Sequence, residues 1–389
     1  MALILNYLSI HHFQRTNMAL IFTKNYLDTD LLSTGNAWVV QFESDTVETP
    51  TRATVEFLGE TFSIDPDPNG KFRFDFQRSV NSKVNTNDFN DPLNSVDISG
   101  GTFIYNEAGS YLSIDVDYTI EFEVAGDETS SNSYRFLKAV YDTLQFQLGK
   151  QSIVNDLSVL LPQTDGEYYA RTTSTQPFDL SIYSKVANAS LLVYNTTTGE
   201  DLNWSVTEGV NRVFFQDGLG NEMPTITLQD GWNRIQVFPI NGNQSVFEII
   251  NIHKEAEDCL TVLKWLNLEG GYAYFPFVHE TQDFAGSTKD FIENDYETFD
   301  DYEANLVSTG TDLVQQLEHT AIRIKSNEAK GLKGLIASPK VYQLFFKEDD
   351  TPLWKERVFK KGELRLKQTG KNVFDFQIKT FQKENGYTL

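Results

Sequence analysis

Residues 65–70 carry the side chains with which a calcium-binding loop begins. Asp65 and Asp67 stand at the first and third positions and Asn69 at the fifth, and oxygen ligands at this spacing can surround a Ca²⁺ ion. The twelfth position is Phe76, where such a loop needs a bidentate glutamate, and the neighbouring sequence favours strands over helices. We therefore interpret residues 65–70 as a hairpin turn stiffened by two prolines, and not as a metal site.

The five histidines and the one cysteine are too scattered to form a metal centre or a nucleophilic pair. No two histidines have the i, i+4 spacing with an intervening Glu that a helical zinc site uses; they are His11, His12, His253, His279 and His319. Cys259 precedes a strongly apolar strand, so we expect it to pack as a small buried hydrophobic residue rather than to act as a thiolate. A lone cysteine also excludes an intramolecular disulfide.

Acidic side chains are densest between Glu293 and Glu303, where they alternate with Tyr296, Phe299 and Tyr302. This mixture resembles a sugar-binding wall, but a glycosidase needs two carboxylates held across a cleft by a rigid scaffold. The segment has no strand or helix periodicity, so we interpret it as an exposed interaction loop. The sequence also has no phosphate-binding glycine loop, nucleophile elbow or basic aromatic platform. We therefore predict no enzyme and no catalytic, metal-binding or cofactor-binding residue.

The charge of the chain is strongly acidic and unevenly distributed. There are 55 acidic and 32 basic side chains, a net charge of -23, and such a surface repels a phosphate backbone. Residues 321–389 hold 15 basic and 8 acidic side chains, a net charge of +7, so the other 320 residues carry -30. In a symmetric ring this asymmetry would align neighbours head to tail. The alternative is that the two regions have solvated sheet faces of different composition.

The first seventeen residues are expected to be an upstream extension. The first four residues recur from Met18 onward, which indicates that Met18 is the natural start. Residues 1–8 are apolar but lack the basic start and the small-residue cleavage site of a secretory signal. No apolar run approaches the ~18 residues that a membrane-spanning helix needs.

Strand patterns dominate the sequence and predict a mainly β protein. We expect several β-sandwich-like domains in tandem, with few short helices. Residues 18–160 are predicted to form a β-rich N-terminal domain, in which residues 38–42 and 53–57 are paired strands. A short helix over residues 134–148 would cover one sheet face or edge.

Two further domains are predicted after this one. Residues 165–250 are expected to form an immunoglobulin-like or fibronectin-like sandwich, because short strands alternate with Asn, Gly and Asp turns. Residues 251–389 are expected to form a C-terminal β domain, with a weak helical pattern over residues 311–324. The strands expected in the sandwich are residues 178–183, 190–194, 212–216, 225–228 and 233–238.

A hairpin in the third domain is the most specific element of the sequence. Two apolar runs flank residues 267–271, which include glycines able to take a positive φ. One arm carries Trp265 and the other carries Tyr272, Tyr274, Phe275 and Phe277.

This hairpin resembles one found in virion structural proteins of tailed phages that infect Bacteroidetes-type bacteria. A second stretch strengthens the resemblance, since residues 338–342 look like the Ser-Pro-x-Val-Tyr entry into a strand in the same proteins. The hairpin residues that carry the resemblance are Lys264, Trp265, Leu266, Asn267, Gly270, Gly271 and Tyr272.

The resemblance implies a tail, baseplate or neck ring component that has no enzymatic activity. Its partners would be copies of itself in a symmetric ring and other virion proteins. Its location would be the virion, after synthesis in the cytoplasm of a bacterial host.

The alternative from another class is a carbohydrate-binding adhesin or host-recognition module. Its middle sandwich would present Tyr168, Tyr169, Trp204 or Trp232 to a host glycan. A third interpretation, a secreted polysaccharide hydrolase, would need activity that depends on one specific carboxylate pair.

Overall fold

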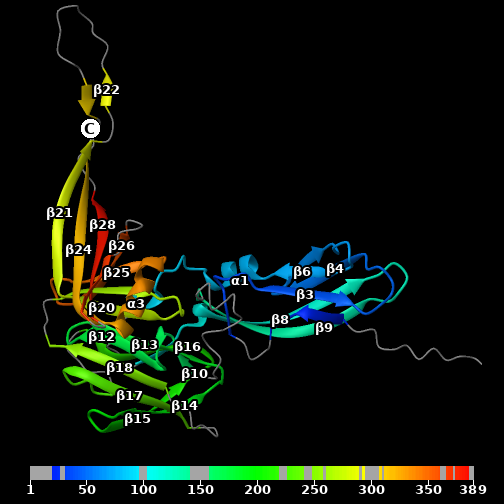
Figure 1. Cartoon of the computed structure of the whole chain (residues 1–389), viewed down its shortest axis with the longest axis horizontal. Coiled ribbons are helices and arrows are strands. Elements are labelled where there is room, and N and C mark those ends of the chain that lie inside the picture. The colour runs from blue at the N-terminus through cyan, green and yellow to red at the C-terminus, as the bar shows by residue number, and fades with distance from the viewer. Residues whose placement is uncertain are drawn as a thin grey trace, which may run out of the picture. The chain divides into compact units, whose positions relative to one another are not determined.

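A computed structural model describes residues 20–26, 31–95, 103–140, 157–218, 226–240, 248–256, 260–288, 291–293, 306–308, 311–359, 365–370 and 373–384. Cys259, the first two histidines and most of the acidic segment after Glu293 lie outside these residues. Contacts divide the chain into two compact units (Figure 1), and each is described by itself. Unit 1 comprises residues 1–32, 36–80 and 113–136, and unit 2 comprises residues 33–35, 81–112 and 137–389.

Unit 1 is built from two antiparallel sheets. One has the order β1 (Leu20–Lys24), β3 (Val39–Ser44) and β6 (Phe72–Asp75). The other has the order β2 (Leu31–Ser33), β9 (Glu128–Leu137), β8 (Tyr111–Glu121), β4 (Arg52–Phe57) and β5 (Glu60–Ile64). Helix α1 (Gln77–Val84) follows β6.

Aromatic side chains fill the core of unit 1. Phe42 of the first sheet lies 5.2 Å from Tyr118 of the second, measured between ring centroids, and stacks on Phe72 at 5.4 Å. The two sheets therefore face each other as a sandwich. The hydroxyl groups of Tyr118 and Tyr134 are 2.9 Å apart, which satisfies two buried polar groups at once.

One prediction for this region is wrong and another fails in its described part. The strands at residues 38–42 and 53–57 exist, but they belong to different sheets and are not paired. Of the helix expected over residues 134–148, residues 134–137 end strand β9 and residues 138–140 are not helical, while residues 141–148 lie outside the described residues. A short apolar run fits both periods, and here Tyr134 and Phe136 are buried in the alternating pattern of a strand.

Unit 2 contains a β-sandwich in the middle of the chain. Its four-stranded sheet has the order β10 (Leu157–Val159), β13 (Pro177–Ser184), β16 (Gly209–Asp217) and β7 (Ile104–Asn106). The facing six-stranded sheet has the order β11 (Gln163–Thr164), β12 (Glu167–Thr173), β18 (Glu248–Glu255), β17 (Gly231–Pro239), β14 (Ala189–Asn195) and β15 (Glu200–Val206). The pair β12–β18 is parallel.

Four of the five strands predicted for the sandwich are confirmed, and the strand at residues 225–228 is not. Its described part, residues 226–228, is not in a strand. Side chains pair with the backbone of Thr227 instead, since its N–H donates to Glu200 at 2.9 Å and its carbonyl accepts from Asn195 at 3.0 Å.

A second sheet in unit 2 is built from the C-terminal third of the chain. Its order is β20 (Tyr272–Phe277), β19 (Thr261–Leu266), β25 (Val341–Phe346), β26 (Pro352–Phe359), β28 (Val373–Glu384), β24 (Thr311–Lys325) and β21 (His279–Thr288). β27 (Arg365–Gly370) pairs with β28. Helix α3 (Ser326–Ala337) and the short 3-10 turns Pro92–Ser95 and Ala108–Ser110 complete the unit.

The helix expected over residues 311–324 is wrong, because β24 occupies them. This strand pairs along one edge with β21 and along the other with β28, so its backbone hydrogen bonds are made across the sheet. The helix that does form, α3, starts one residue after β24 ends. Fold class is as predicted: the chain is mainly β, with sandwich-like sheets and few short helices.

The sandwich and the C-terminal sheet share one hydrophobic core, which runs from Leu157 to Ile378. Ring centroids of Phe178 on β13 and Tyr274 on β20 lie 5.4 Å apart within it. Strand β7 of the sandwich also comes from the range expected for the N-terminal domain. The predicted boundaries near residues 160 and 250 stay a prediction, and contacts alone divide the chain differently.

Strands β21 and β24 form one long hairpin. Their register runs from His279 opposite Thr320 to Thr288 opposite Thr311. The short pair β22 (Phe291–Glu293) and β23 (Leu306–Ser308) continues the same register, with Phe291 opposite Ser308. We call residues 279–320 the arm (Figure 1, β21 to β24). β24 has 15 residues, a length of about 50 Å at the usual rise of a strand.

Candidate functional site

Strands β13 and β16 are buried on both faces, which forces any charge on them to be paired. Phe178, Leu180 and Ile182 of β13 belong to the hydrophobic core. The alternate residues, which include Asp179, point to the other face of the sheet, and that face is covered because every residue of β13 and β16 is buried. A buried charge is tolerated only with a partner.

Arg212 of β16 is the centre of this pairing. Its Nε and Nη2 atoms each lie 2.8 Å from one carboxylate oxygen of Asp179, and its Nη1 lies 2.5 Å from Asp91. Only 1% of the arginine side chain is exposed. Burial acts to lower the pKa of Arg212, but the charges of Asp179 and Asp91 outweigh burial and raise it.

Lys264 of the predicted hairpin is the second buried cation. Its Nζ lies 2.7 Å from Asp91, donates to Asn94 as well, and sits 4.3 Å from the ring centre of Trp354. Burial lowers the pKa of Lys264 and outweighs the neighbouring carboxylate. Burial would raise the pKa of Asp91, but the two cations hold it well below its usual range.

These four residues form a closed and electrically balanced set, which we call the charged cluster: Asp91, Asp179, Arg212 and Lys264. Tyr274 donates a hydrogen bond to Asp179, and the Arg212 guanidinium lies 4.3 Å from the ring centre of Tyr272. Two cations face two carboxylates, so the interior gains no net charge. The Lys264 Nζ is buried and hydrogen-bonded to Asp91 and Asn94.

Glu107 adjoins the charged cluster without balancing it. Its carboxylate lies 3.9 Å from Arg212 and accepts a hydrogen bond of 2.6 Å from Ser110. Burial raises the pKa of Glu107, although Arg212 opposes that rise.

The turn of the predicted hairpin is confirmed, and its glycines allow the backbone of the turn to lie close to Leu160 and its neighbours. Leu266 faces Tyr272 across the end of the ladder, and Gly270 has φ +87. A Cβ on Gly271 would lie 2.3 Å from the carbonyl oxygen of Leu160. Asn267 donates to that same carbonyl at 2.8 Å. The hairpin is therefore bound to the residue that follows β10 of the sandwich.

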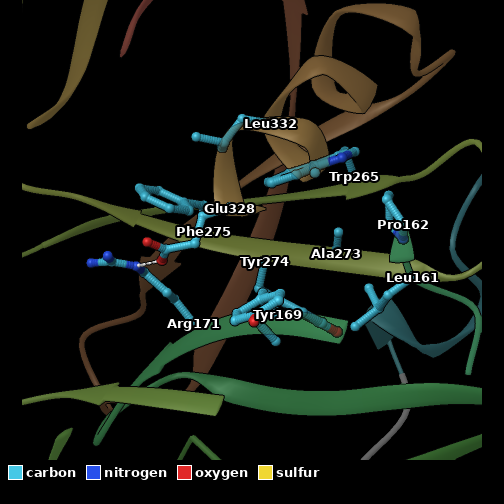
Figure 2. Close-up of a pocket in the computed structure, with 12 residues that line it drawn as sticks. Leu161, Pro162, Tyr169, Arg171, Trp265, Ala273, Tyr274, Phe275, Glu328 and Leu332 are labelled. Carbon is cyan, nitrogen blue, oxygen red and sulfur yellow. Dashed lines mark hydrogen bonds and ion pairs between the residues drawn. The ribbon is translucent and has the colours of Figure 1, made fainter. Parts of the chain in front are cut away.

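Two small cavities lie beside these residues. One, of about 50 Å³, touches Arg212, Lys264 and Trp354. The other, of about 30 Å³, lies between β12, β20 and α3 and is lined by Trp265, Phe275 and Leu332 (Figure 2). One water occupies about 30 Å³ in the liquid. Both cavities can therefore hold ordered water.

An ion pair closes one side of the smaller cavity (Figure 2). Arg171 Nε lies 2.5 Å from Glu328 at the start of α3, and its Nη1 lies 2.6 Å from Glu255 on β18. Burial acts to lower the pKa of Arg171, but both glutamates outweigh it and raise that pKa. This pair ties α3 to the sandwich.

Residues 65–70 form a turn, as predicted, but not a hairpin turn. β5 and β6 belong to different sheets, so the segment is a corner between them. One carboxylate oxygen of Asp67 accepts from the backbone of Asn69 at 2.8 Å and of Lys71 at 2.9 Å. These bonds lower the pKa of Asp67 and fix the turn.

The histidines and acidic residues of the described ranges form no group of three that could hold a metal ion. His253 lies on β18, with Nδ1 3.0 Å from Glu255. His279 is the first residue of β21, and His319 is buried beside Phe277, with ring centres 5.7 Å apart.

The aromatic residues proposed for glycan binding separate into two pairs. Tyr168 and Trp204 are buried in the sandwich core, with exposed fractions of 6% and 0%, and are not available to a ligand. Tyr169 and Trp232 are half-buried on the outward face of the six-stranded sheet, where their rings lie 6.2 Å apart and nearly perpendicular.

Comparisons with known proteins identify no family. No family model and no curated protein sequence matches the chain. A tetra-tandem repeat from the extending region of a large adhesion protein is 12% identical over 96% of this chain and 91% of that one, with a TM-score of 0.23. The fibronectin(III)-like modules of Clostridium thermocellum CbhA are 8% identical, with 61% and 94% covered and a TM-score of 0.19. A Ca²⁺-stabilized, ice-binding adhesin of an Antarctic bacterium is 10% identical, with 87% and 97% covered and a TM-score of 0.18.

Scores this low carry no argument about function. Within the described part of the chain, no helix has the length and apolar character to cross a membrane.

Sequence reasoning missed the charged cluster. Asp179 alternates with the apolar residues Phe178 and Leu180 along its strand, a pattern that predicts a solvated face, and Arg212 follows the polar Asn211. The signal that could have found them is the burial of Lys264, because a lysine between Leu263 and Trp265 in an aromatic hairpin needs a carboxylate.

Proposed function

We propose that this chain is a non-catalytic structural subunit of a phage virion. It is a tail, baseplate or neck ring component that acts by protein–protein assembly, with copies of itself and other virion proteins as partners. The resemblance of the hairpin at residues 259–277 to hairpins of phage virion proteins supports a location in the virion. The mainly β fold supports a role in protein–protein assembly.

The observation that carries the proposal is the arm. β28 pairs with β24 only as far as Leu313. The continuation of the hairpin, β22 with β23, has no third strand among the described residues. Isolated two-stranded hairpins are marginally stable in water, so the two-stranded end of the arm, β22 with β23, is best explained by a partner that covers it.

The charged cluster supports a structural role over a catalytic one. It links segment 81–112, the sandwich and the hairpin through hydrogen bonds of 2.5–2.8 Å. Both buried cations are held by carboxylates. A subunit that transmits load in a ring needs such internal ties, whereas an enzyme needs a reactive group that is free to act.

The proposal is tested in particles purified from the phage that carries this gene. Quantitative mass spectrometry should find the chain in intact particles, at a fixed ratio to the other structural proteins. If the chain is found only in the lysate and never in particles, the proposal is wrong.

A second candidate function, recognition of a host glycan, rests on Tyr169 and Trp232 at the outward face of the sandwich. A glycan array with the full chain should then give a signal that Trp232→Ala abolishes. Tyr194→Ala is the matched control, because Tyr194 is an aromatic residue 36% exposed on the neighbouring strand β14. Equal signals from both variants would remove this candidate.

A further inference from the structure

Two strands of the C-terminal sheet, β21 and β27, are paired along one side only in the described part of the chain. The strands β21, β24, β28 and β27 are neighbours in this order and every pair is antiparallel, while β26 pairs with β28 on the side where β27 also lies. Among the described residues, β21 pairs only with β24 and β27 only with β28. Each of these outer strands therefore presents an edge of backbone N–H and C=O groups that can accept another strand.

The outer edge of β21 lacks three common protections against strand addition, namely a short length, a bulge and a proline or lysine. The strand is 10 residues long, and its sequence contains neither proline nor lysine. Its register with β24 is continuous from His279 to Thr288, without a bulge. Exposed edges that must stay unpaired are commonly short, bulged or marked by these two residues.

The charges of the two edge strands are opposite. β21 carries Glu280 and Asp283 and neither lysine nor arginine, and the arm to which it belongs, residues 279–320, contains 11 acidic side chains and one lysine in its sequence. β27 begins with Arg365 and carries Lys367, and it belongs to the basic region of residues 321–389, with a net charge of +7. Two arms would repel each other, so pairing of β21 with β21 across a two-fold axis is disfavoured.

Strand direction also favours a head-to-tail contact between β21 and β27. Directions alternate across the four strands, so β21 and β27 of one copy run in opposite directions. Rotation about an axis along the strands preserves their direction, which places the β27 of the next copy antiparallel to β21. The two edge strands are offset along the strand direction. β27 lies beside residues 373–377 of β28, whereas β21 begins beside Thr320 of β24, which is itself opposite Gln377 of β28. An offset between neighbouring strands is usual in closed sheets.

We propose that the acidic edge strand β21 of one copy adds to the basic edge strand β27 of a second copy. The contact is heterologous, and its repetition produces a ring in which one antiparallel sheet continues from subunit to subunit. This inference rests on the proposed function and names the partner, a second copy of the chain, and the two strands that meet.

The experiment measures the native mass of the full chain by light scattering over a range of concentrations at low salt. The arm variant is Asp283→Asn, Asp290→Asn and Glu293→Gln, and the strand variant is Arg365→Glu with Lys367→Glu. The matched control removes three acids that are exposed in unit 1, Glu60→Gln, Asp65→Asn and Asp127→Asn. Circular dichroism confirms that every variant keeps its strand content.

The arm and strand variants should weaken assembly by about tenfold or more, and the control should assemble as the unmodified chain does. A charge swap, Asp283→Lys and Asp290→Lys with Arg365→Glu and Lys367→Glu, should restore assembly, which a merely misfolded variant would not do. Unchanged assembly of the arm and strand variants, or a chain that stays monomeric throughout, would overturn the proposed contact. The presence of the chain in particles is measured separately, so failure of this contact is distinguishable from failure of the proposed function.

Discussion

Asp91→Asn is the most informative single change in the charged cluster. The Asp91 carboxylate lies 2.5 Å from Arg212 and 2.7 Å from Lys264. Arg212 keeps both hydrogen bonds to Asp179 in the variant, whereas Lys264 loses its nearest carboxylate. One buried positive charge is then left uncompensated, which costs about 3–5 kcal/mol of the free energy of unfolding.

The free energy of unfolding is measured by urea titration with tryptophan fluorescence. Of the five tryptophans, all except Trp38 lie in unit 2, so the signal reports mainly the unit that holds the cluster. Lys379→Met is the control, because the Lys379–Glu318 pair is 3.6 Å long and about one third exposed. Such a pair contributes about 0–1 kcal/mol.

Two further measurements separate the charge from the shape of the site. The double variant Asp91→Asn with Lys264→Met removes both charges, so it should recover about 2 kcal/mol or more of the loss. In Asp91→Asn alone, the pKa of Lys264 falls further below its unfolded value of about 10.4. The unfolded chain then binds more protons than the folded chain, so the stability of the variant rises with pH. The loss of unfolding free energy caused by Asp91→Asn should therefore become smaller as pH rises from 7 towards 10.

A cost of Asp91→Asn below about 1 kcal/mol would refute this reasoning. Strict additivity in the double variant would refute it as well, because additivity would mean that the two side chains do not interact.

Three other predictions concern stability. Gly271→Ala should cost about 2 kcal/mol or more in urea titrations, because its Cβ would meet the Leu160 carbonyl at 2.3 Å, whereas Gly126→Ala has nothing within 4 Å and should be nearly neutral. Trp204→Ala should cost about 3–5 kcal/mol, because this side chain is fully buried between the sheets of the sandwich. The pKa of Asp91 is lowered in the folded chain, so the stability that this carboxylate contributes is present above about pH 4 and is lost as pH falls further. Acid titration followed by circular dichroism should show this loss of stability in the unmodified chain and a smaller loss in Asp91→Asn.

Local patterns were sufficient to predict the strands that alternate or that flank a clear turn. The hairpin around residues 267–271 and four strands of the sandwich formed as expected. The helix over residues 311–324 was wrong, because apolar side chains at helical spacing also fit a strand once a long partner strand is available. The helix over residues 134–148 fails in its described part, residues 134–140, and the rest of it lies outside the described residues.

The charged cluster could not be predicted because it depends on which faces become covered. The alternation around Asp179 predicts one solvated face, yet β20 and its neighbours cover that face in the folded unit. Asp91 is also 121 positions from Arg212, and no local pattern relates the two. The sheet edges at β21 and β27 became visible only from the pairing of the strands.

The native mass of the full-length chain at low and high ionic strength tests the central claim of assembly most directly. We predict a symmetric oligomer, with a mass that is a whole multiple of 44.3 kDa at low salt and decreases as salt screens the opposite charges of β21 and β27. A single species of 44.3 kDa at every concentration and salt would contradict the claim.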